Sequence, residues 1–565
     1  MDELQQTSGV NGTSTNGDSE SQPHKLRSRR NRGGWLACFF ISATLTGMMI
    51  AGWGWVANLI VYLVGVFNVK SIDATQAANV INGSTNLIPI LGAVLADSFL
   101  GSFRVVSVSI LSSLLGIIIL TLTATLSYLR PHCETGSSVC HAPSKLHLAV
   151  LYSAITLAAI GFGMVRFAIG TLGAHQFDNP KDQASFFNWF IFTMFAAGVV
   201  GSVGIVYIED SISWGLGFGI CAAINFVCLV IFLVGNRFYR HDKPQGSPYT
   251  SLARVIVAAT RKRKLLVSSE SKDYHHEIND GENKDIATMP KRSFRFLNHA
   301  AIKTEGDINS DGSIAKPWRL CSVQQVEDLK TLIRIFPVFA STVLLCTPLA
   351  VQTNTAVLQA IAMDRHLGSN FKIPAGSISI VGLISSAAFI ALLDRLLYPN
   401  LKNLTGRWLT PLQKIGTGHV FNTLSLVIAA VVESKRLKTA RDNHLQGQQG
   451  GAVVPMLALW LFPQLIVVGM GEAFHYPGNV SLYYQEFPVS MKSAATSMIS
   501  IAIGIAFYVS AALVSLLRNV TGWLPNDINQ GRLDNVYWTF VLLGFLNFCY
   551  FLLCAKFYRY QNLQQ

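Results

Sequence analysis

Residues 148–174 read LAVLYSAITLAAIGFGMVRFAIGTLGA, and Arg166 is the only charged residue among them. The run is longer than the roughly 20 apolar residues that an α-helix needs to cross a bilayer. A guanidinium at that depth costs about 2.5–3.5 kcal/mol on insertion scales, so such arginines usually face a water-filled cavity. The alternative is an arginine near a helix end whose long side chain reaches the lipid headgroups.

The composition is that of a polytopic membrane protein. Of the 565 residues, 50% are hydrophobic and 13% are charged, and the mean hydropathy is +0.38. A soluble protein carries about 25% charged residues. The net charge of +13 does not indicate a nucleic-acid partner, because the basic residues fall mostly in loops beside apolar runs, where they set topology. The 9 cysteines show no CxxC spacing, and nucleotide loops and nucleophile motifs are absent from the sequence, so we expect no enzyme, cofactor or metal.

Apolar runs recur along the chain, six before and six after a long polar segment. This arrangement predicts an all-α membrane protein with the major facilitator fold, in which twelve transmembrane helices form two six-helix bundles around a central site. The runs cover about 35–64, 74–97, 104–128, 146–173, 186–207, 213–236, 328–350, 373–397, 408–432, 453–475, 491–516 and 535–558.

The domain boundaries follow from these runs. Residues 1–33 are polar and are expected to be a disordered cytoplasmic N-terminus. The N-terminal six-helix bundle is expected over 34–236 and the C-terminal bundle over 327–560. Residues 237–326 between them are expected to be a cytoplasmic linker that could contain a lateral helix.

Charge predicts the topology. The basic cluster at 24–32 precedes the first run and therefore places the N-terminus in the cytoplasm, and an even number of spans returns the C-terminus to the same side. The basic residues at 435–438 are an exception, because they fall in an expected outer loop. Cys133 and Cys140 share another outer loop, where an oxidising compartment makes a disulfide as plausible as two free thiols.

Two polar turns are expected to act in gating at the cytoplasmic ends of the spans. The first contains Gly92, Asp97 and Gly101: the glycines permit a tight turn, and the carboxylate can cap a helix or form an ion pair. The second contains Asp394 and Arg395 at the related place in the other half. The first motif is fairly specific, whereas the second is weak by itself.

Three further motifs carry a family resemblance: FFNW at 186–189, LGAHQFD at 172–178 and GEAF at 471–474. Together they resemble the plant nitrate/peptide transporter family, which belongs to the proton-coupled oligopeptide transporter group of the major facilitators. The resemblance runs from about residue 33 to 560. The first helix (43–63) and the FNVKSI segment (67–72) look like the nitrate excretion branch of that family.

The chain departs from the family pattern in the first helix. Family members usually carry a Glu-x-x-Glu-Arg motif there, upstream of an Asn-Leu-x-x-Tyr-Leu run. Counting back from that run, which is 58–63 here, places Leu45, Met48 and Met49 at the three charged positions. Leucine and methionine cannot carry a proton, so we expect no proton symport through this motif.

The resemblance also gives Arg166 a role. The family usually has a lysine at this place in the fourth helix, paired with a glutamate in the tenth, which is Glu472 here. A guanidinium presents a planar fork of donors that suits a flat oxyanion such as nitrate. Desolvation offsets much of the attraction in a buried ion pair, so we expect an Arg166–Glu472 pair to act as a switch, released by an anion or by protonation of Glu472.

Other candidate substrate contacts come from polar residues near the expected cavity. Gln352 and Asn354 either line it or are satisfied by backbone groups, and Asn58 and Tyr62 belong to the first-helix run. The seventh-helix histidine linked to nitrate binding in a dual-affinity relative corresponds to Leu349, so we expect that site to be lost.

The leading hypothesis is a low-affinity transporter for passive efflux of nitrate, with chloride as a second candidate, working by alternating access. The alternatives are a transporter of a larger organic anion or glycoside, such as a defence metabolite or hormone conjugate, and a nitrate transceptor. The expected partners are the lipid bilayer and a small inorganic anion, with no nucleic acid. We expect a monomer or weak homodimer in the plasma membrane, with the vacuolar membrane as the alternative.

Overall fold

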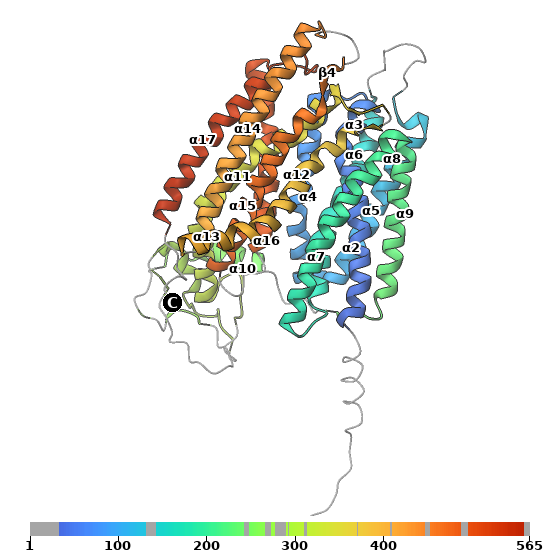
Figure 1. Ribbon diagram of the computed structural model, residues 1–565. Helices are drawn as coiled ribbons and strands as arrows, with labels where there is room; N and C mark the ends of the chain where they lie inside the picture. The colour runs from blue at the N-terminus through green and yellow to red at the C-terminus, as the bar shows by residue number, and fades with distance from the viewer. Residues whose placement is uncertain are drawn as a thin grey trace, which may run out of the picture.

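The computed structural model describes residues 33–131, 143–241, 248–265, 270, 273–276, 290–291, 293–309, 314–369, 371–406, 409–446, 452–487 and 495–558. Within these residues, 12 helices are long and apolar enough to cross a membrane. Figure 1 shows them as two helical bundles side by side, one before the linker and one after it. The predicted fold class is confirmed.

The N-terminal half contains the first six spans, three of which consist of more than one helical segment. Its elements are α2 (Gly34–Ala57), α3 (Leu59–Gly65), α4 (Ser71–Leu95), η1 (Ala96–Leu100), α5 (Ser102–Thr125), η2 (Ser127–Leu129), α6 (Lys145–Ala174), α7 (Pro180–Val200), η3 (Gly201–Ile205), α8 (Val206–Ser211) and α9 (Trp214–Gly235).

The linker contributes α10 (Pro248–Arg261) and η5 (Arg295–Ala301), and the C-terminal half contains the last six spans. Its helices are α11 (Val323–Ile361), η6 (Ala375–Ser379), α12 (Ile380–Leu392), η7 (Leu393–Leu397), α13 (Tyr398–Thr405), α14 (Pro411–Asp442), η8 (Ala458–Leu461), α15 (Phe462–Glu486), α16 (Ala495–Thr521) and α17 (Leu533–Phe557). Two short pairings tie loops together: parallel β1 (Met363–Asp364) with β4 (Val454–Leu457), and antiparallel β2 (His366–Leu367) with β3 (Phe371–Lys372).

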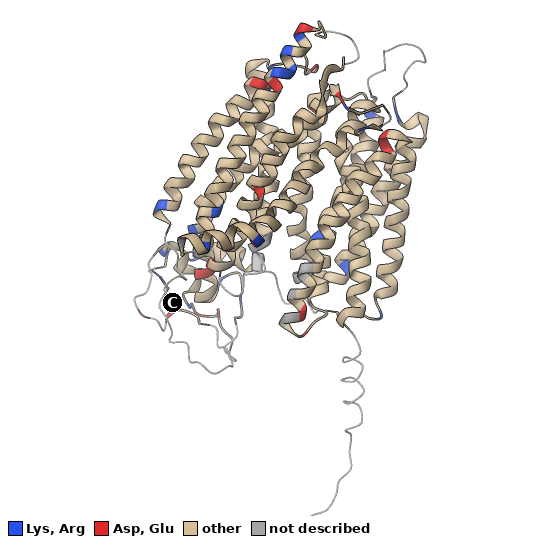
Figure 2. Cartoon of the chain, viewed as in Figure 1, with Lys and Arg blue, Asp and Glu red and all other residues tan. Residues whose placement is uncertain are grey.

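The two ends of the bundles differ. The helix α2 begins and α17 ends at the end where α10 lies, which we call the linker end; the opposite end is the far end (Figure 1). Lys, Arg, Asp and Glu gather at both ends, and few lie at mid-depth (Figure 2). This distribution is expected for helices whose middle portions face hydrocarbon.

Local sequence explains where several spans begin. Three of them start with a capping box. In this motif the N-cap hydroxyl accepts a hydrogen bond from the backbone N–H of the residue three positions later, and the side chain of that later residue accepts one from the N-cap N–H. The boxes pair Ser144 with His147, Ser322 with Gln325, and Thr410 with Gln413. Each box satisfies two backbone donors that a helix start leaves free.

Glycines bring α5 and α6 into backbone contact. A Cβ atom on Gly161 would lie 2.4 Å from the Ser109 carbonyl oxygen, and one on Gly116 would lie 2.4 Å from the Ala158 nitrogen. Small residues allow such close approach, which drives helix association in membranes. This contact fixes α6, the helix that carries Arg166.

The halves meet at the far end and at mid-depth. Ion pairs join Arg518 to Asp73 and Arg365 to Asp210, and hydrogen bonds join Asn354 to Asn79, Gln76 to Ser515, Ser377 to the Ser202 carbonyl, and Ser84 to Tyr508. All six of these contacts lie at the far end or at mid-depth.

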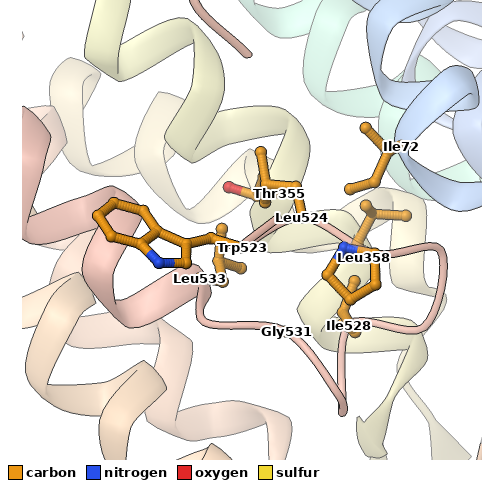
Figure 3. A pocket seen from close by; sticks show the side chains of 9 residues that line it. Ile72, Thr355, Leu358, Trp523, Leu524, Ile528, Gly531 and Leu533 are labelled. Atoms are coloured by element: carbon orange, nitrogen blue, oxygen red, sulfur yellow. The ribbon is translucent and has the colours of Figure 1, made fainter. Parts of the chain in front are cut away.

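The segment after α16 covers the far end. Figure 3 shows Trp523, Leu524 and Ile528 of this segment beside Leu358 of α11 and Ile72 of α4. The cavity between them is about 10 Å³, which is room for one water at most. Apolar packing therefore adds to the polar contacts that close this end.

Two expected loops are helical instead. The second gating motif, Asp394 and Arg395, lies in η7 within a continuous helical run, with both side chains exposed, and the run ends only at Thr405 with Gly406 as its C-cap. The basic residues at 435–438 lie in α14, because Arg436 is neutralised inside the helix by Glu433. Hydropathy ended both spans too early.

Candidate functional site

Arg166 lies about two turns before the linker end of α6. Its guanidinium carbon is 5.7 Å from the centroid of the Phe162 ring, one turn away, a distance at which a cation is attracted to the ring face. The side chain is only partly exposed, and its nitrogens are neither hydrogen-bonded to a described residue nor sealed from water. The donors of this guanidinium are therefore available to a ligand.

The first helix passes beside Arg166. A Cβ on Gly52 would lie 2.2 Å from the Phe162 ring, so α2 and α6 touch at this level. The two helices are antiparallel, so one turn toward the linker end leads from Gly52 to Met48 and from Phe162 to Arg166. Arg166 thus lies level with positions where the family pattern places charges and this chain has methionine.

Glu472 is the deep charge of the C-terminal half. Its carboxylate accepts hydrogen bonds from the Ser386 hydroxyl at 2.8 Å and from the Tyr476 hydroxyl at 3.4 Å. The side chain is partly exposed. The two hydroxyls hold the carboxylate in place and stabilise its negative charge.

The Arg166–Glu472 ion pair is not formed in this structure. Each residue interacts with groups of its own half: Arg166 with Phe162, and Glu472 with Ser386 and Tyr476. The physical reason is the geometry of the halves, which meet toward the far end, whereas Arg166 lies toward the linker end. An ion pair between them would require the halves to approach there.

Comparison with known proteins identifies the scaffold. The POT family profile matches residues 103–529. The chain is 53% identical over 554 residues to Protein NRT1/ PTR FAMILY 2.7 of Arabidopsis thaliana, covering 98% of each chain. It is 50% identical over 535 residues to Protein NRT1/ PTR FAMILY 2.3 of the same plant, covering 94% of each. The chain belongs to the POT family.

Solved structures of POT family members share the fold. An auto-inhibited POT family peptide transporter superposes with a TM-score of 0.69 at 16% identity, covering 94% of this chain and 98% of that one. The POT family transporter PepTSo gives a TM-score of 0.67 at 17% identity, covering 94% and 99%. Family and structural neighbours are transporters, so this protein is a multi-pass membrane transporter and not an enzyme.

In this POT transporter the first-helix side chains do not line a cavity. Leu45 and Met48 are 1% exposed and Met49 is 0% exposed, packed among apolar side chains of the N-terminal half. Three uncharged side chains are more stable inside the bundle than facing water.

Three of the predicted substrate contacts are structural in this conformation. Asn58 donates to the Glu209 carboxylate at 3.0 Å, and the Tyr62 hydroxyl lies 3.0 Å from that of Thr123. Gln352 is bonded to Ser425 within the C-terminal half. All three are buried, because polar groups inside a bundle find side-chain partners there.

Asn354 has a different place. Its amide donates to Asn79 of α4, so it joins the two halves instead of lining one of them. Leu349, at the position of the lost histidine, is 6% exposed in α11. Neither side chain contacts Arg166 in this structure, and Cys133 and Cys140 lie outside the described residues.

The first gating motif lies at the linker end. Gly92 packs against Met164 of α6, where a Cβ would lie 3.3 Å from the methionine side chain. Gly101 has φ 78°, which favours glycine, and joins η1 to α5. The backbone of Asp97 is in η1, and its side chain lies outside the described part of the structure.

Two hollows lie elsewhere. One of about 470 Å³ is lined by mainly apolar residues of both halves, among them Tyr207 and Phe371. The other, of about 500 Å³, lies in the linker beside Arg263 and His299. Neither hollow includes Arg166 or Glu472, and the first has no cation to bind an anion.

Sequence analysis missed two buried acids. Glu433 forms an ion pair with Arg436 at 2.7 Å, and both side chains are fully buried. Glu209 is 1% exposed and lies in the last helical segment of the fifth span. The available signal was an acidic residue within two residues of an expected span end, which was assigned to a loop.

Proposed function

We propose that this POT transporter is a passive, low-affinity carrier for nitrate, with chloride as a second substrate, and that Arg166 binds the anion. The observation that carries the proposal is the unpaired, water-accessible guanidinium of Arg166 beside a first helix that has no carboxylate. A nitrate ion can accept two parallel hydrogen bonds from such a fork. Compared with the family pattern, two glutamates and one arginine are replaced, so the site has one negative charge fewer.

The direction follows from the membrane potential. One negative charge moving outward gains about 2.3 kcal/mol per 100 mV of inside-negative potential. Uptake of the same ion must overcome this electrical free energy, and a proton symporter does so by carrying protons inward together with the anion. A carrier without the first-helix carboxylates is suited to the downhill direction, with the linker end in the cytoplasm, and the plasma membrane is the compartment we propose.

Alternating access supplies the mechanism. In the present arrangement the named contacts join the halves at the far end and at mid-depth, and Arg166 lies toward the linker end of α6. Binding of an anion between Arg166 and the C-terminal half would reduce the electrostatic cost of bringing Glu472 closer. The linker end could then close while the far end opens, as in other transporters with a site between two halves.

The test is anion flux through the full chain in oocytes. Nitrate efflux and current are measured against voltage and external pH for wild type, Arg166→Ala and Arg104→Ala, with surface protein quantified. Arg104 is an exposed arginine at the linker end of α5 and serves as a matched control. We expect Arg166→Ala to abolish the nitrate current and Arg104→Ala to retain it; strongly proton-driven nitrate uptake would sink the proposal.

A second candidate substrate is a bulky organic anion or glycoside, although Leu45, Met48 and Met49 face the interior of the bundle and provide no surface for it. It can still be tested directly. Organic anions and glycosides are added at tenfold excess over labelled nitrate, and efflux is measured. Little competition supports a small-anion site, whereas strong inhibition with transport of the competitor would favour the rival.

A further inference from the structure

Glu209 is a buried acid without a cation. It lies at the far end of the N-terminal half in α8, with 1% of its surface exposed. Asn58 Nδ2 donates to one carboxyl oxygen, Oε2, at 3.0 Å. The other oxygen, Oε1, has no hydrogen-bond partner. Among the described residues, none of the recorded ion pairs includes Glu209.

The groups around Glu209 do not supply a positive charge. Tyr62 on α3 and Cys221 on α9 are the titratable side chains that act on it from neighbouring helices, and both are neutral when protonated. The cation Arg130, which follows η2, acts on Tyr62 and donates to the Ala124 carbonyl, but it forms no recorded ion pair with Glu209. On its own helix, Asp210 adds a negative charge, and Arg365 is engaged by Asp210 at 3.4 Å. The segments η3, η6 and α2, which also pack against α8, contain no Asp, Glu, Lys, Arg or His.

The Glu209–Asn58 pair lacks one donor. Two oxygens of this pair are sealed and unpartnered, Oε1 of Glu209 and Oδ1 of Asn58. An ionised carboxylate only accepts hydrogen bonds, whereas a protonated one also has an O–H donor. Leaving a charged group buried and unpaired costs several kcal/mol. A proton on Glu209 would remove the charge and supply the missing donor.

The pair lies at the contact that closes the far end. A Cβ on Gly376 of η6, in the other half, would be 2.6 Å from Asn58 Oδ1 and 2.8 Å from the Ala57 carbonyl oxygen. The next residue of η6, Ser377, donates to the Ser202 carbonyl at 2.8 Å. Separating the halves here would uncover Asn58, so the closed contact is what keeps water from this pair.

We infer that Glu209 is a proton-binding site whose occupancy stabilises the closed far end. With the far end open, the carboxylate takes a proton from solution at that end, and –COO⁻ plus H₃O⁺ becomes –COOH plus water. Closure then buries a neutral acid. Opening returns the proton to the same side, so no proton crosses the membrane. The inference goes beyond the proposed function and does not depend on which anion is carried.

The experiment measures opening of the far end without any anion substrate. Spin labels are placed at Ile212 and Val520, which are 63% and 73% exposed at the far ends of the two halves. The full chain, with cysteines 133, 140, 549 and 554 replaced by serine, is studied in nanodiscs between pH 5 and 9. We expect the ratio of open to closed molecules to rise by up to about tenfold per pH unit, the limit for release of one proton.

Substitutions test whether the pH dependence of far-end opening comes from Glu209. Glu209→Gln retains the shape of the acid and adds an N–H donor, so it should stay closed at every pH. Glu209→Met is a second neutral variant with the same expectation if the glutamine variant fails to fold. Glu305→Gln, a charge change in the linker away from the far end, should keep the wild-type pH slope. A flat wild-type response, or a Glu209→Gln variant with the wild-type slope, would overturn the inference.

Discussion

Two arginines inside the spans of this POT transporter have opposite surroundings. Arg436, at the far end of α14, is fully buried and forms two hydrogen bonds with Glu433, at 2.8 and 2.7 Å, while Asn529 and the Ile528 carbonyl accept two more of its N–H groups. Arg166, toward the linker end of α6, is partly exposed, and among the described side chains its recorded interaction is with the Phe162 ring. The same side chain is satisfied in one place and unsatisfied in the other.

The difference separates a structural group from a binding group. Burying a guanidinium is tolerated at Arg436 because its charge is paired with Glu433 and four hydrogen bonds hold it. Arg166 has no hydrogen-bond or ion-pair partner recorded among the described residues, and we propose that it binds the anion. The bonds of Arg436 also hold the segment that covers the far end, whereas Arg166 lies toward the linker end of α6.

The largest effect is expected when the buried Arg436–Glu433 ion pair is broken. Arg436→Met leaves Glu433 buried and unpaired, which costs about 3–5 kcal/mol. We expect a large fall in the thermal unfolding midpoint of the purified protein and a loss of monodisperse material. Arg166→Met, measured alongside, should not destabilise the protein.

A double variant serves as control for that prediction. Glu433→Gln with Arg436→Met removes both charges and should be more stable than Arg436→Met alone. If Arg166→Met proved as unstable as Arg436→Met, Arg166 would be a structural residue and the contrast would fail.

The second-largest effect is expected at Arg166, where two substitutions should weaken nitrate binding to different degrees. Hydrogen bonds to charged groups contribute about 1.5–3 kcal/mol each, and each 1.4 kcal/mol is tenfold in affinity. Arg166→Met should therefore weaken nitrate binding by at least about tenfold. Arg166→Lys keeps the charge but not the fork and should fall between. The half-saturating nitrate concentration in liposome flux measurements is the readout, and equal values for lysine and methionine would show that the fork is not used.

A smaller effect is expected across the site. Glu472→Gln removes a negative charge that faces an incoming anion but keeps an acceptor for Ser386 and Tyr476. We expect the half-saturating nitrate concentration to fall a few-fold, since partly hydrated charges interact by about 1 kcal/mol or less. Glu305→Gln in the linker makes the same charge change away from the site and should leave flux unchanged. Loss of transport in Glu472→Gln would instead indicate that its charge is needed to close the linker end.

The fold could be predicted from hydropathy because the bilayer allows little else than helices of span length. Helix ends could not. Arg436 lies in a basic run that hydropathy assigns to a loop, and its partner Glu433 is only one turn away on the same helix. The break in the first span at Asn58 was also not foreseen, because that side chain turns toward Glu209, 151 residues away in sequence.

The candidate site was predicted only in part. Arg166 stands out in the sequence because a charge in an apolar run has few explanations. Tyr62 and Gln352 were assigned to the cavity, yet each bonds a hydroxyl inside its own bundle, and their partners lie 61 and 73 residues away. A single sequence does not show which polar residues are hydrogen-bonded to one another. It therefore does not distinguish a residue that lines a cavity from one that is hydrogen-bonded inside its own bundle.

The smallest expected effect concerns a third arginine, Arg518, which is paired but exposed. It bonds Asp73 across the two halves at the far end, and the side chains are 28% and 45% exposed. Water competes for such a pair, so it contributes about 0–1 kcal/mol. Arg518→Gln should therefore raise the open fraction in the spin-label measurement at constant pH by less than about fivefold. Asp73→Asn should have the same effect, and the double variant should add little, because each single change already removes the pair. A far end that opened completely in either single variant would mean that this exposed pair, and not the buried contacts around Asn58 and Gly376, holds the halves together.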